Sequence, residues 1–265
     1  MIAVGHGPRV QLHRPGLLRP TRAGIADPLN GLTILSRFQT YSRFSGSVAP
    51  IGLYSGGVPV TLDSNSFDEW RDVLGTGGDS VTQATPGFQP TLHYNAGKPY
   101  VRMDGAGSFL TRAPFPNALP GTILISTRFI PVASLATSQQ MIAGSERNDL
   151  GGNFDAGLGI AFFGAASMFG WGGNWFSQNI FTGAPPLGSP VVVTIEVDSG
   201  LSRATLYING TSVGTITDSG FSLVNQSLYI GGDDVGQCAQ IDISDVLIYQ
   251  DTTYRSTVET YLMSM

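Results

Sequence analysis

The sequence predicts an all-β fold: an antiparallel two-sheet sandwich or jelly roll, with an extended N-terminal arm and a short C-terminal helix. Three observations support this fold class. The 265 residues include 35 glycines and 16 prolines, and only 12% of them are charged, which is typical of strands and turns. From about Ser47, short β-rich runs bounded by Gly, Asn, Asp and Pro follow one another. With 42% hydrophobic residues, one sandwich of this size can bury a core.

Residues 1–45 are predicted to form the extended arm, and residues 46–265 the jelly-roll domain. Prolines recur every five to eight residues in the arm, at Pro8, Pro15, Pro20 and Pro28. Proline removes a backbone donor and blocks helix interiors and central strands, so a polyproline-like conformation is expected.

Within the domain, the clearest element is a hairpin over Ala204–Thr217, where two β-branched runs flank Asn209-Gly210, the preferred type I′ turn. Five further strands are predicted at Thr122–Pro131, Gly157–Phe163, Val191–Val197, Leu228–Gly231 and Ile241–Tyr249. A single helix is predicted over residues 253–263, because its apolar residues share a face. These residues are Tyr254, Val258, Tyr261 and Leu262.

The formal charge of −5 divides unevenly along the chain. Residues 1–45 hold six arginines and one acidic residue, and the remainder holds eight basic and eighteen acidic residues. The arginines are Arg9, Arg14, Arg19, Arg22, Arg37 and Arg43. We expect them to bind an anionic partner, such as the acidic body of a neighbouring copy of the chain. Nucleic acid is disfavoured, because Lys98 is the only lysine and no aromatic residue precedes Phe38.

Targeting and redox features agree with assembly in a reducing cytoplasm. Gly7-Pro8-Arg9 and Arg14-Pro15 interrupt every apolar run that could serve as a secretory signal, so none is expected. The apolar stretch from Gly157 to Trp171 is too short to span a bilayer. Cys238 is the only cysteine, which excludes an intrachain disulfide and a cysteine zinc cluster.

Three segments, taken in order, resemble the concanavalin A-like, laminin-G-type jelly roll of lectins and glucanases. They are "WRDVLGTGGDSVTQATPGFQPTL" from Trp70, "GKPYVRMDGAGSFL" from Gly97, and the Asn209-Gly210 hairpin followed by "LYIGG" and "IDISDVLIY". The resemblance covers roughly residues 50–265 and leaves the arm unmatched. It implies a fold that also occurs in bacteriophage virion proteins, and that carries sugar binding, glycan hydrolysis and scaffolding alike.

The sequence supplies no recognisable catalytic set. Glycosidases of this superfold use Glu-x-Asp-x-x-Glu on one strand; Glu196 and Asp198 match its first half, but Leu201 stands where the second Glu should be. Gly210–Gly214 fits Gly-x-Ser-x-Gly, but in a hairpin with no histidine after it. We therefore predict no catalytic residues and no enzymatic activity.

No metal or cofactor is predicted either. Asp233-Asp234, and Asn153 with Asp155, are oxygen-rich clusters of a type that calcium prefers. Neither reproduces a specific ligand spacing, so both are interpreted as solvated turn residues.

The segment from Gly164 to Phe181 concentrates aromatic residues among glycines. They could fill the sandwich core, form an intersubunit contact, or stack on sugar rings. The candidate glycan or interface residues are Trp171, Asn174, Trp175 and Phe176.

The leading hypothesis is a non-enzymatic bacteriophage virion structural or decoration protein, assembled in the host cytoplasm. Its arm would anchor an outward-facing sandwich to other virion proteins of the capsid or tail, or to copies of itself. The alternative is a carbohydrate-binding module that recognises host or environmental glycans. A third hypothesis is a polysaccharide-degrading enzyme that depends on Glu196. No membrane partner is expected.

Overall fold

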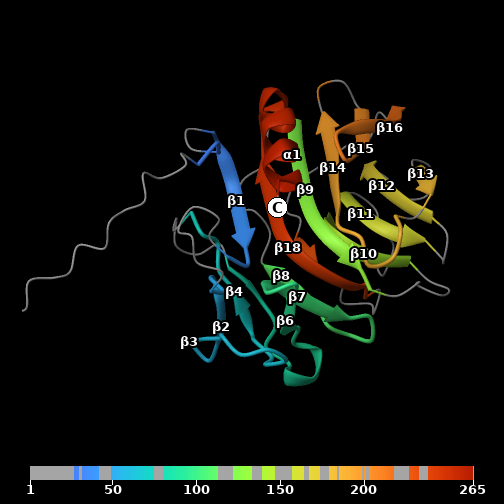
Figure 1. Cartoon of the computed structure of the whole chain (residues 1–265). Helices are drawn as coiled ribbons and strands as arrows, with labels where there is room; N and C mark the ends of the chain where they lie inside the picture. Colours follow the sequence, from blue (N-terminus) through green and yellow to red (C-terminus); the bar gives the residue numbers. More distant parts are fainter. Residues whose placement is uncertain are drawn as a thin grey trace, which may run out of the picture.

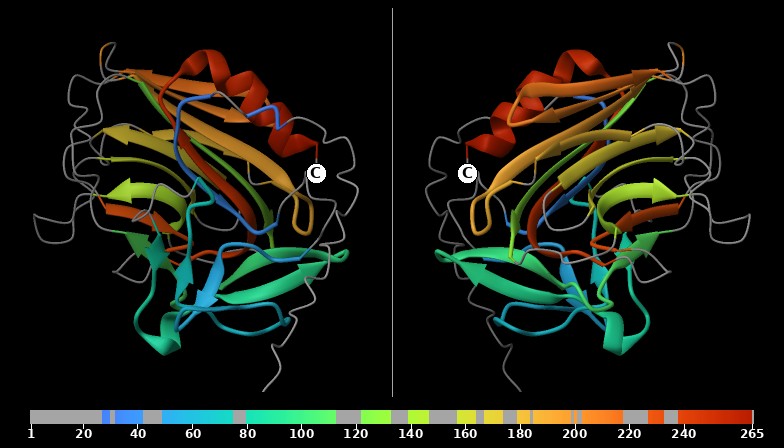
Figure 2. Two further views of the ribbon diagram at one scale, coloured as in Figure 1. Left: turned by 90° about the vertical axis from the view of Figure 1, so that its left-hand side faces the viewer. Right: turned by 90° about the vertical axis from the view of Figure 1, so that its right-hand side faces the viewer.

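A computed structural model describes the chain over residues 27–29, 32–41, 49–74, 80–112, 122–132, 139–146, 157–163, 167–173, 179–183, 185–198, 200, 203–217, 227–232 and 238–264. These residues form two antiparallel β-sheets with one α-helix outside them (Figure 1). Figure 2 shows the sheets as stacked layers, with helix α1 on the outer side of one. The predicted all-β sandwich with a C-terminal helix is confirmed.

The eight-stranded sheet has the order β16-β15-β14-β9-β18-β7-β6, and β1 pairs with β18 beside β7. Its strands are β1 (Ile34–Gln39), β6 (Thr91–Asn95), β7 (Lys98–Asp104), β9 (Thr122–Pro131), β14 (Val191–Asp198), β15 (Arg203–Ile208), β16 (Thr211–Thr217) and β18 (Gln240–Tyr249). Strands β9 and β18, each ten residues long, form its centre.

The ten-stranded sheet has the order β13-β12-β11-β10-β17-β8-β5-β4-β2-β3. Its strands are β2 (Leu53–Ser55), β3 (Val58–Pro59), β4 (Glu69–Trp70), β5 (Val81–Thr82), β8 (Leu110–Arg112), β10 (Gln139–Glu146), β11 (Gly157–Phe163), β12 (Ser167–Gly173), β13 (Asn179–Gly183) and β17 (Ser227–Ile230). The helical elements are η1 (Pro86–Phe88), η2 (Thr252–Tyr254) and α1 (Arg255–Met263).

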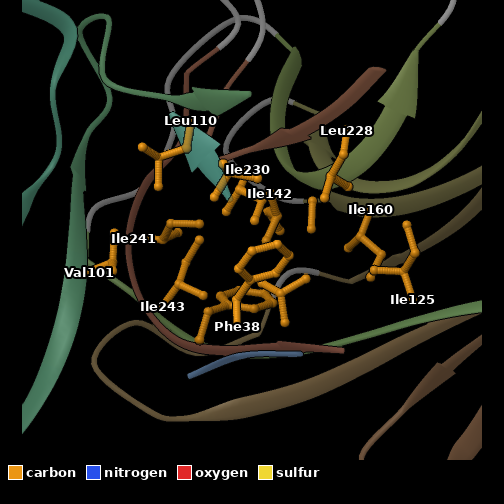
Figure 3. Packing of buried hydrophobic residues seen from close by; sticks show 14 of the residues in the cluster. Phe38, Val101, Leu110, Ile125, Ile142, Ile160, Leu228, Ile230, Ile241 and Ile243 are labelled. Atoms are coloured by element: carbon orange, nitrogen blue, oxygen red, sulfur yellow. The ribbon is translucent and has the colours of Figure 1, made fainter. Parts of the chain in front are cut away.

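The hydrophobic core lies between the two sheets. Figure 3 shows apolar side chains of both layers meeting there, among them Leu228 and Ile230 from β17 and Ile243 from β18. Each fully buried side chain of this size stabilises the fold by about 1.5–3 kcal/mol. The largest is Trp70, whose ring centroid lies 5.8 Å from that of Phe38 and whose Nε1 donates a hydrogen bond to the carbonyl oxygen of Gln39 (3.1 Å).

Helix α1 covers the outer side of the eight-stranded sheet through a second apolar cluster. Val258, Tyr261 and Leu262 of the helix are buried there. They pack against four side chains of the central strands: Leu124, Val192, Leu247 and Tyr249. The helical face predicted from the sequence is therefore the face that docks.

The predicted hairpin is also confirmed, with β15 and β16 joined at Asn209-Gly210. Asn209 and Gly210 have φ values of 47° and 82°, and both must be positive in a type I′ turn. The Asn209 side chain accepts a hydrogen bond from the backbone N–H of Val192 (2.9 Å), which fixes the turn to β14.

The structure corrects the prediction for one part of the arm. Ile34–Gln39 is strand β1 of the eight-stranded sheet, and the Arg37 side chain is buried. Arg37 Nη1 binds the carboxylate of Asp27 at 2.6 Å, and its Nη2 donates to the Tyr261 hydroxyl at 2.9 Å. The physical reason is that no proline stands between Pro28 and Pro50, so a strand can form and pair with β18.

Candidate functional site

One row of residues crosses the ten-stranded sheet on a single face. In antiparallel pairing, partners on neighbouring strands share a face, and successive residues of a strand alternate between faces. The row is Tyr54, Glu69, Thr82, Thr111, Tyr229, Gly144, Gly159, Trp171 and Asn179. The chain neighbours Leu53, Trp70 and Ile160 belong to the core, so the row lies on the outer face.

Two glycine positions lie between two aromatic positions in the middle of this row. Gly144 and Gly159 pair with each other, and they separate Tyr229 on one side from Trp171 on the other. One step further along the strands, Phe169 of β12 pairs with Ala161 of β11. Aromatic register positions on β12 therefore lie beside positions on β11 that carry little or no side chain.

Two more aromatic rings, those of Phe109 and Phe88, extend this face from Tyr229. The Phe109 and Tyr229 ring centroids are 6.3 Å apart, and those of Phe88 and Phe109 are 6.4 Å apart with an interplanar angle of 29°. Tyr229 is buried, whereas Phe88, in η1, is 45% exposed. The stack thus ends in a ring that solvent or a ligand can reach.

A charged group closes the other end of the row. The Arg71 guanidinium lies 3.6 Å from the centroid of the Tyr54 ring, and its Nη2 is 2.8 Å from Glu69 Oε2. Ser80 Oγ donates to Glu69 Oε1 at 2.7 Å. The hydrogen bonds from Arg71 and Ser80 hold the pKa of Glu69 below its usual range. Arg71 and Glu69 compensate each other, so this end carries no net charge.

A second polar group lies under helix α1, on the eight-stranded sheet. Arg255 Nη1 is 2.7 Å from Glu259 Oε2, and its Nε is 3.9 Å from Glu196 Oε2. The Arg255 guanidinium also lies 3.8 Å from the centroid of the Tyr207 ring. Burial raises the pKa of Glu259, against the opposing effect of Arg255.

Arg255 connects Glu196 to a second carboxylate, Glu259, that the sequence did not indicate. Glu259 comes from the C-terminal helix, and no strand motif would have located it. The arginine binds both carboxylates and stacks on Tyr207, so the group fastens α1 to β14 and β15. The Arg-x-x-x-Glu spacing of a helical ion pair was the only sequence signal.

Most of the predicted site residues lie outside the described residues. This holds for Arg9, Arg14, Arg19, Arg22 and Arg43, and for Asn174, Trp175 and Phe176. Trp171 is described as a position of β12, and Arg37 is inside the domain. Trp171 is thus the one predicted glycan residue that the sheet register locates.

The candidate calcium residues Asn153, Asp155, Asp233 and Asp234 also lie outside the described residues. Within the described part of the chain, no group of three or more His, Cys, Asp or Glu side chains could hold a metal ion. The described residues likewise include no helix long and apolar enough to cross a membrane.

No protein-family model matches the chain, and no curated protein matches it in sequence. Among solved structures, it is similar to Trypanosoma rangeli sialidase in complex with 2,3-difluorosialic acid, a covalent intermediate, at 12% identity and a TM-score of 0.56. It is also similar to the binding domain of Paraclostridial Mosquitocidal Protein 1, at 13% identity and a TM-score of 0.52.

Each match covers 88% of this chain, but only 33% of the sialidase chain and 52% of the binding-domain chain. The chain therefore spans about a third of the length of the sialidase that it matches. The likeness is one of fold. It agrees with the concanavalin A-like, lectin-type sandwich that the sequence motifs implied.

The comparisons contradict the prediction that this chain is not an enzyme, because the structures that it matches include those of a sialidase. That prediction depended on two missing motifs, the Glu-x-Asp-x-x-Glu strand and the serine triad. A domain of this fold can form part of an enzyme chain, as the match to a portion of the sialidase chain illustrates. The similar structures named here include no virion protein, so that assignment stays a prediction.

Proposed function

We propose that this chain binds carbohydrate through the outer face of its ten-stranded sheet, around Trp171. The observation that carries the proposal is the register of β12, which sets Trp171 opposite Gly159 and in line with Tyr229. A sugar ring has an apolar face that packs on aromatic side chains, and Gly159, opposite Trp171, adds no side chain to this part of the face.

The electrostatics of the row fit an uncharged or weakly charged ligand. Its only charged residue is Glu69, which Arg71 neutralises. The other polar members are Thr82, Thr111 and Asn179, whose hydroxyl and amide groups can bond to sugar hydroxyls. The fold agrees with the proposal, since the matched structures include a domain named for binding.

A glycan array followed by calorimetry tests this proposal. We expect binding to one class of glycan, and a loss of about tenfold or more in affinity for Trp171→Ala, the size of effect that an aromatic contact residue has. Trp171→Phe should keep part of the affinity, because a phenyl ring still stacks. Leu187→Ala, at an exposed leucine of the turn before β14, is the control. An array without signal, or full affinity in Trp171→Ala, would overturn the proposal.

A second proposal concerns the N-terminal segment and rests on its charge. Residues 1–26 hold four arginines and no acidic residue. Such a segment favours a carboxylate-rich protein surface, and we propose that it attaches the domain to other subunits of a bacteriophage particle. Changing the four arginines to glutamine should abolish incorporation of the folded protein into particles. Unchanged incorporation would contradict this role.

A further inference from the structure

A groove lies at the open edge of the sandwich, where β3 and β6 are the outermost strands of their sheets. Figure 1 shows β2, β3 and β6 together at the lower end of the molecule. The groove has a volume of about 510 Å³, which is within the range of small-molecule sites. Its lining comes from the β2–β3 hairpin and the following segment: Ser55, Val58, Pro59, Val60, Thr61, Leu62, Ser64, Asn65 and Ser66.

The lining combines apolar walls with hydroxyl and amide groups, and it holds no charged side chain. Val58 and Leu62 are 66% and 65% exposed, the two highest values among the large hydrophobic residues described. The serine, threonine and asparagine side chains of the lining supply hydrogen-bond donors and acceptors. This pairing of exposed aliphatic surface with neutral hydrogen-bonding groups matches a ligand that has both an apolar face and hydroxyl groups.

Two carboxylates close to the lining in the structure bind backbone groups: Asp68 accepts hydrogen bonds from the N–H of Gly56, and Asp63 bonds to β6. Asp63 stands between Leu62 and Ser64 but is not part of the lining. Its Oδ1 accepts a hydrogen bond from the backbone N–H of Tyr94 (3.2 Å) and lies 3.4 Å from Nδ1 of His93. The lining itself carries no charged side chain, which favours an uncharged ligand.

The groove is also fixed before any ligand arrives. The backbone N–H of Ser64 donates to the carbonyl oxygen of Leu92 at 2.7 Å, and the N–H of Leu92 donates to that of Asn65 at 2.9 Å. The Tyr94 hydroxyl donates to the carbonyl oxygen of Thr61 at 3.1 Å. These bonds tie the segment to β6, so binding need not order it, and less affinity is lost to conformational entropy.

We propose that this groove is a second ligand site, which takes one uncharged sugar residue. The apolar face of the ring would pack on Val58 and Leu62, and its hydroxyls would bond to Ser64 and Asn65. The site is independent of the face around Trp171, because the groove opens at the β3/β6 edge and Trp171 belongs to β12, near the other edge of the sheet. The chain would then bind sugars at two separate places.

The test is an NMR titration of the full chain with a panel of uncharged methyl glycosides and, in a separate arm, an uncharged glycine-serine peptide. We expect at least one glycoside to shift the amide signals of Thr61, Leu62 and Asn65, with a dissociation constant on the order of 1 mM for so small a ligand. Leu62→Ala and Asn65→Ala should each weaken this binding about fivefold or more.

Leu187→Ala replaces an exposed leucine that is not part of the groove lining, and it should leave the binding unchanged. Trp171→Ala should also leave it unchanged, which separates failure of this site from failure of the sheet face. Two outcomes would overturn the inference: no glycoside shifts the groove signals, or the peptide shifts them and the glycosides do not.

Discussion

The hydroxyl group of Tyr261, on the C-terminal helix, accepts hydrogen bonds from two side chains of the first strand. Arg37 Nη2 lies 2.9 Å from it, and Gln39 Nε2 also donates to it. All three side chains are buried. Asp27 and Asp245 complete the group by accepting from Arg37 and Gln39 respectively. The two ends of the described chain are thus joined through one phenol oxygen.

Tyr261→Phe should destabilise the domain by about 1–3 kcal/mol, because it leaves buried Arg37 and Gln39 donors without their acceptor. The ring itself, packed in the cluster under α1, would be kept. Urea unfolding at neutral pH measures the change. Tyr254→Phe, in η2 just before the same helix, is the matched control, because no described residue forms a hydrogen bond with the Tyr254 hydroxyl group. Equal free energies of unfolding for wild type and Tyr261→Phe would show that the hydrogen bonds to the Tyr261 hydroxyl do not stabilise the domain.

Truncation should separate the N-terminal segment from the folded domain at β1. Removing residues 1–26 leaves every described strand of both sheets in the chain, whereas removing residues 1–45 deletes β1 and the Phe38 ring that packs on Trp70. Loss of a buried phenylalanine alone costs about 3–5 kcal/mol. We therefore expect the longer deletion to lower the melting temperature far more than the shorter one. Equal melting temperatures would contradict the assignment of β1 to the domain.

The local pattern of the chain predicted individual elements well. The strands Thr122–Pro131 and Gly157–Phe163 were predicted with the bounds of β9 and β11, because alternation or β-rich composition marks them locally. Strand β1 was not predicted, because the arginines of residues 1–45 and the prolines before residue 29 indicated an extended arm over the whole segment.

The relationships between distant segments could not be predicted in this way. The row from Tyr54 to Asn179 depends on the pairing of nine strands, and the meeting of Glu196 with Glu259 depends on where α1 docks. Both arise from tertiary packing, which leaves no periodic signal in the sequence. Trp171 was found because aromatic clustering is local, but the face that it belongs to follows only from the register.

Glu259 should make the domain less stable as the pH rises. Burial raises its pKa above the ordinary value of 4.5, so the folded state favours the protonated form. The stabilisation that the protonated Glu259 gives the folded state is therefore complete below pH 4.5, and it is lost as the pH rises through the raised pKa. Facing groups are Arg255 on the helix, Glu196 and Thr194 on β14, and Tyr207 on β15.

Glu259→Gln should remove this dependence while keeping a polar group of the same shape. Urea unfolding at a series of pH values between 4 and 8 compares the slopes of wild type and variant. Glu69→Gln is the control, because its effect on stability should depend on pH in the opposite direction. The pKa of Glu69 is lowered in the folded state, so the stabilisation by its carboxylate is lost as the pH falls. If the stability difference between wild type and Glu259→Gln is the same at every pH, the assignment is wrong.

Gly105 should tolerate no side chain, because it combines a left-handed backbone with close contact. Its φ is 73°, and a Cβ there would lie 2.9 Å from the Cβ of Gln240 on β18. Gly97 has a similar φ of 76° but nothing within 4 Å of its Cβ position, so it isolates the backbone effect. We expect Gly97→Ala to cost about 1 kcal/mol and Gly105→Ala about 2–4 kcal/mol.

The larger cost follows from where Gly105 lies. It begins the turn in which the Asp104 carboxylate accepts hydrogen bonds from the backbone N–H groups of Ala106 (2.9 Å) and Ser108 (3.0 Å), right after β7 pairs with β18. A shift of Gly105 away from Gln240 would therefore disturb both the turn and the last pair of that ladder. Urea unfolding of the two variants measures the difference, and equal costs would show that contact with Gln240 is relieved without disturbing the sheet.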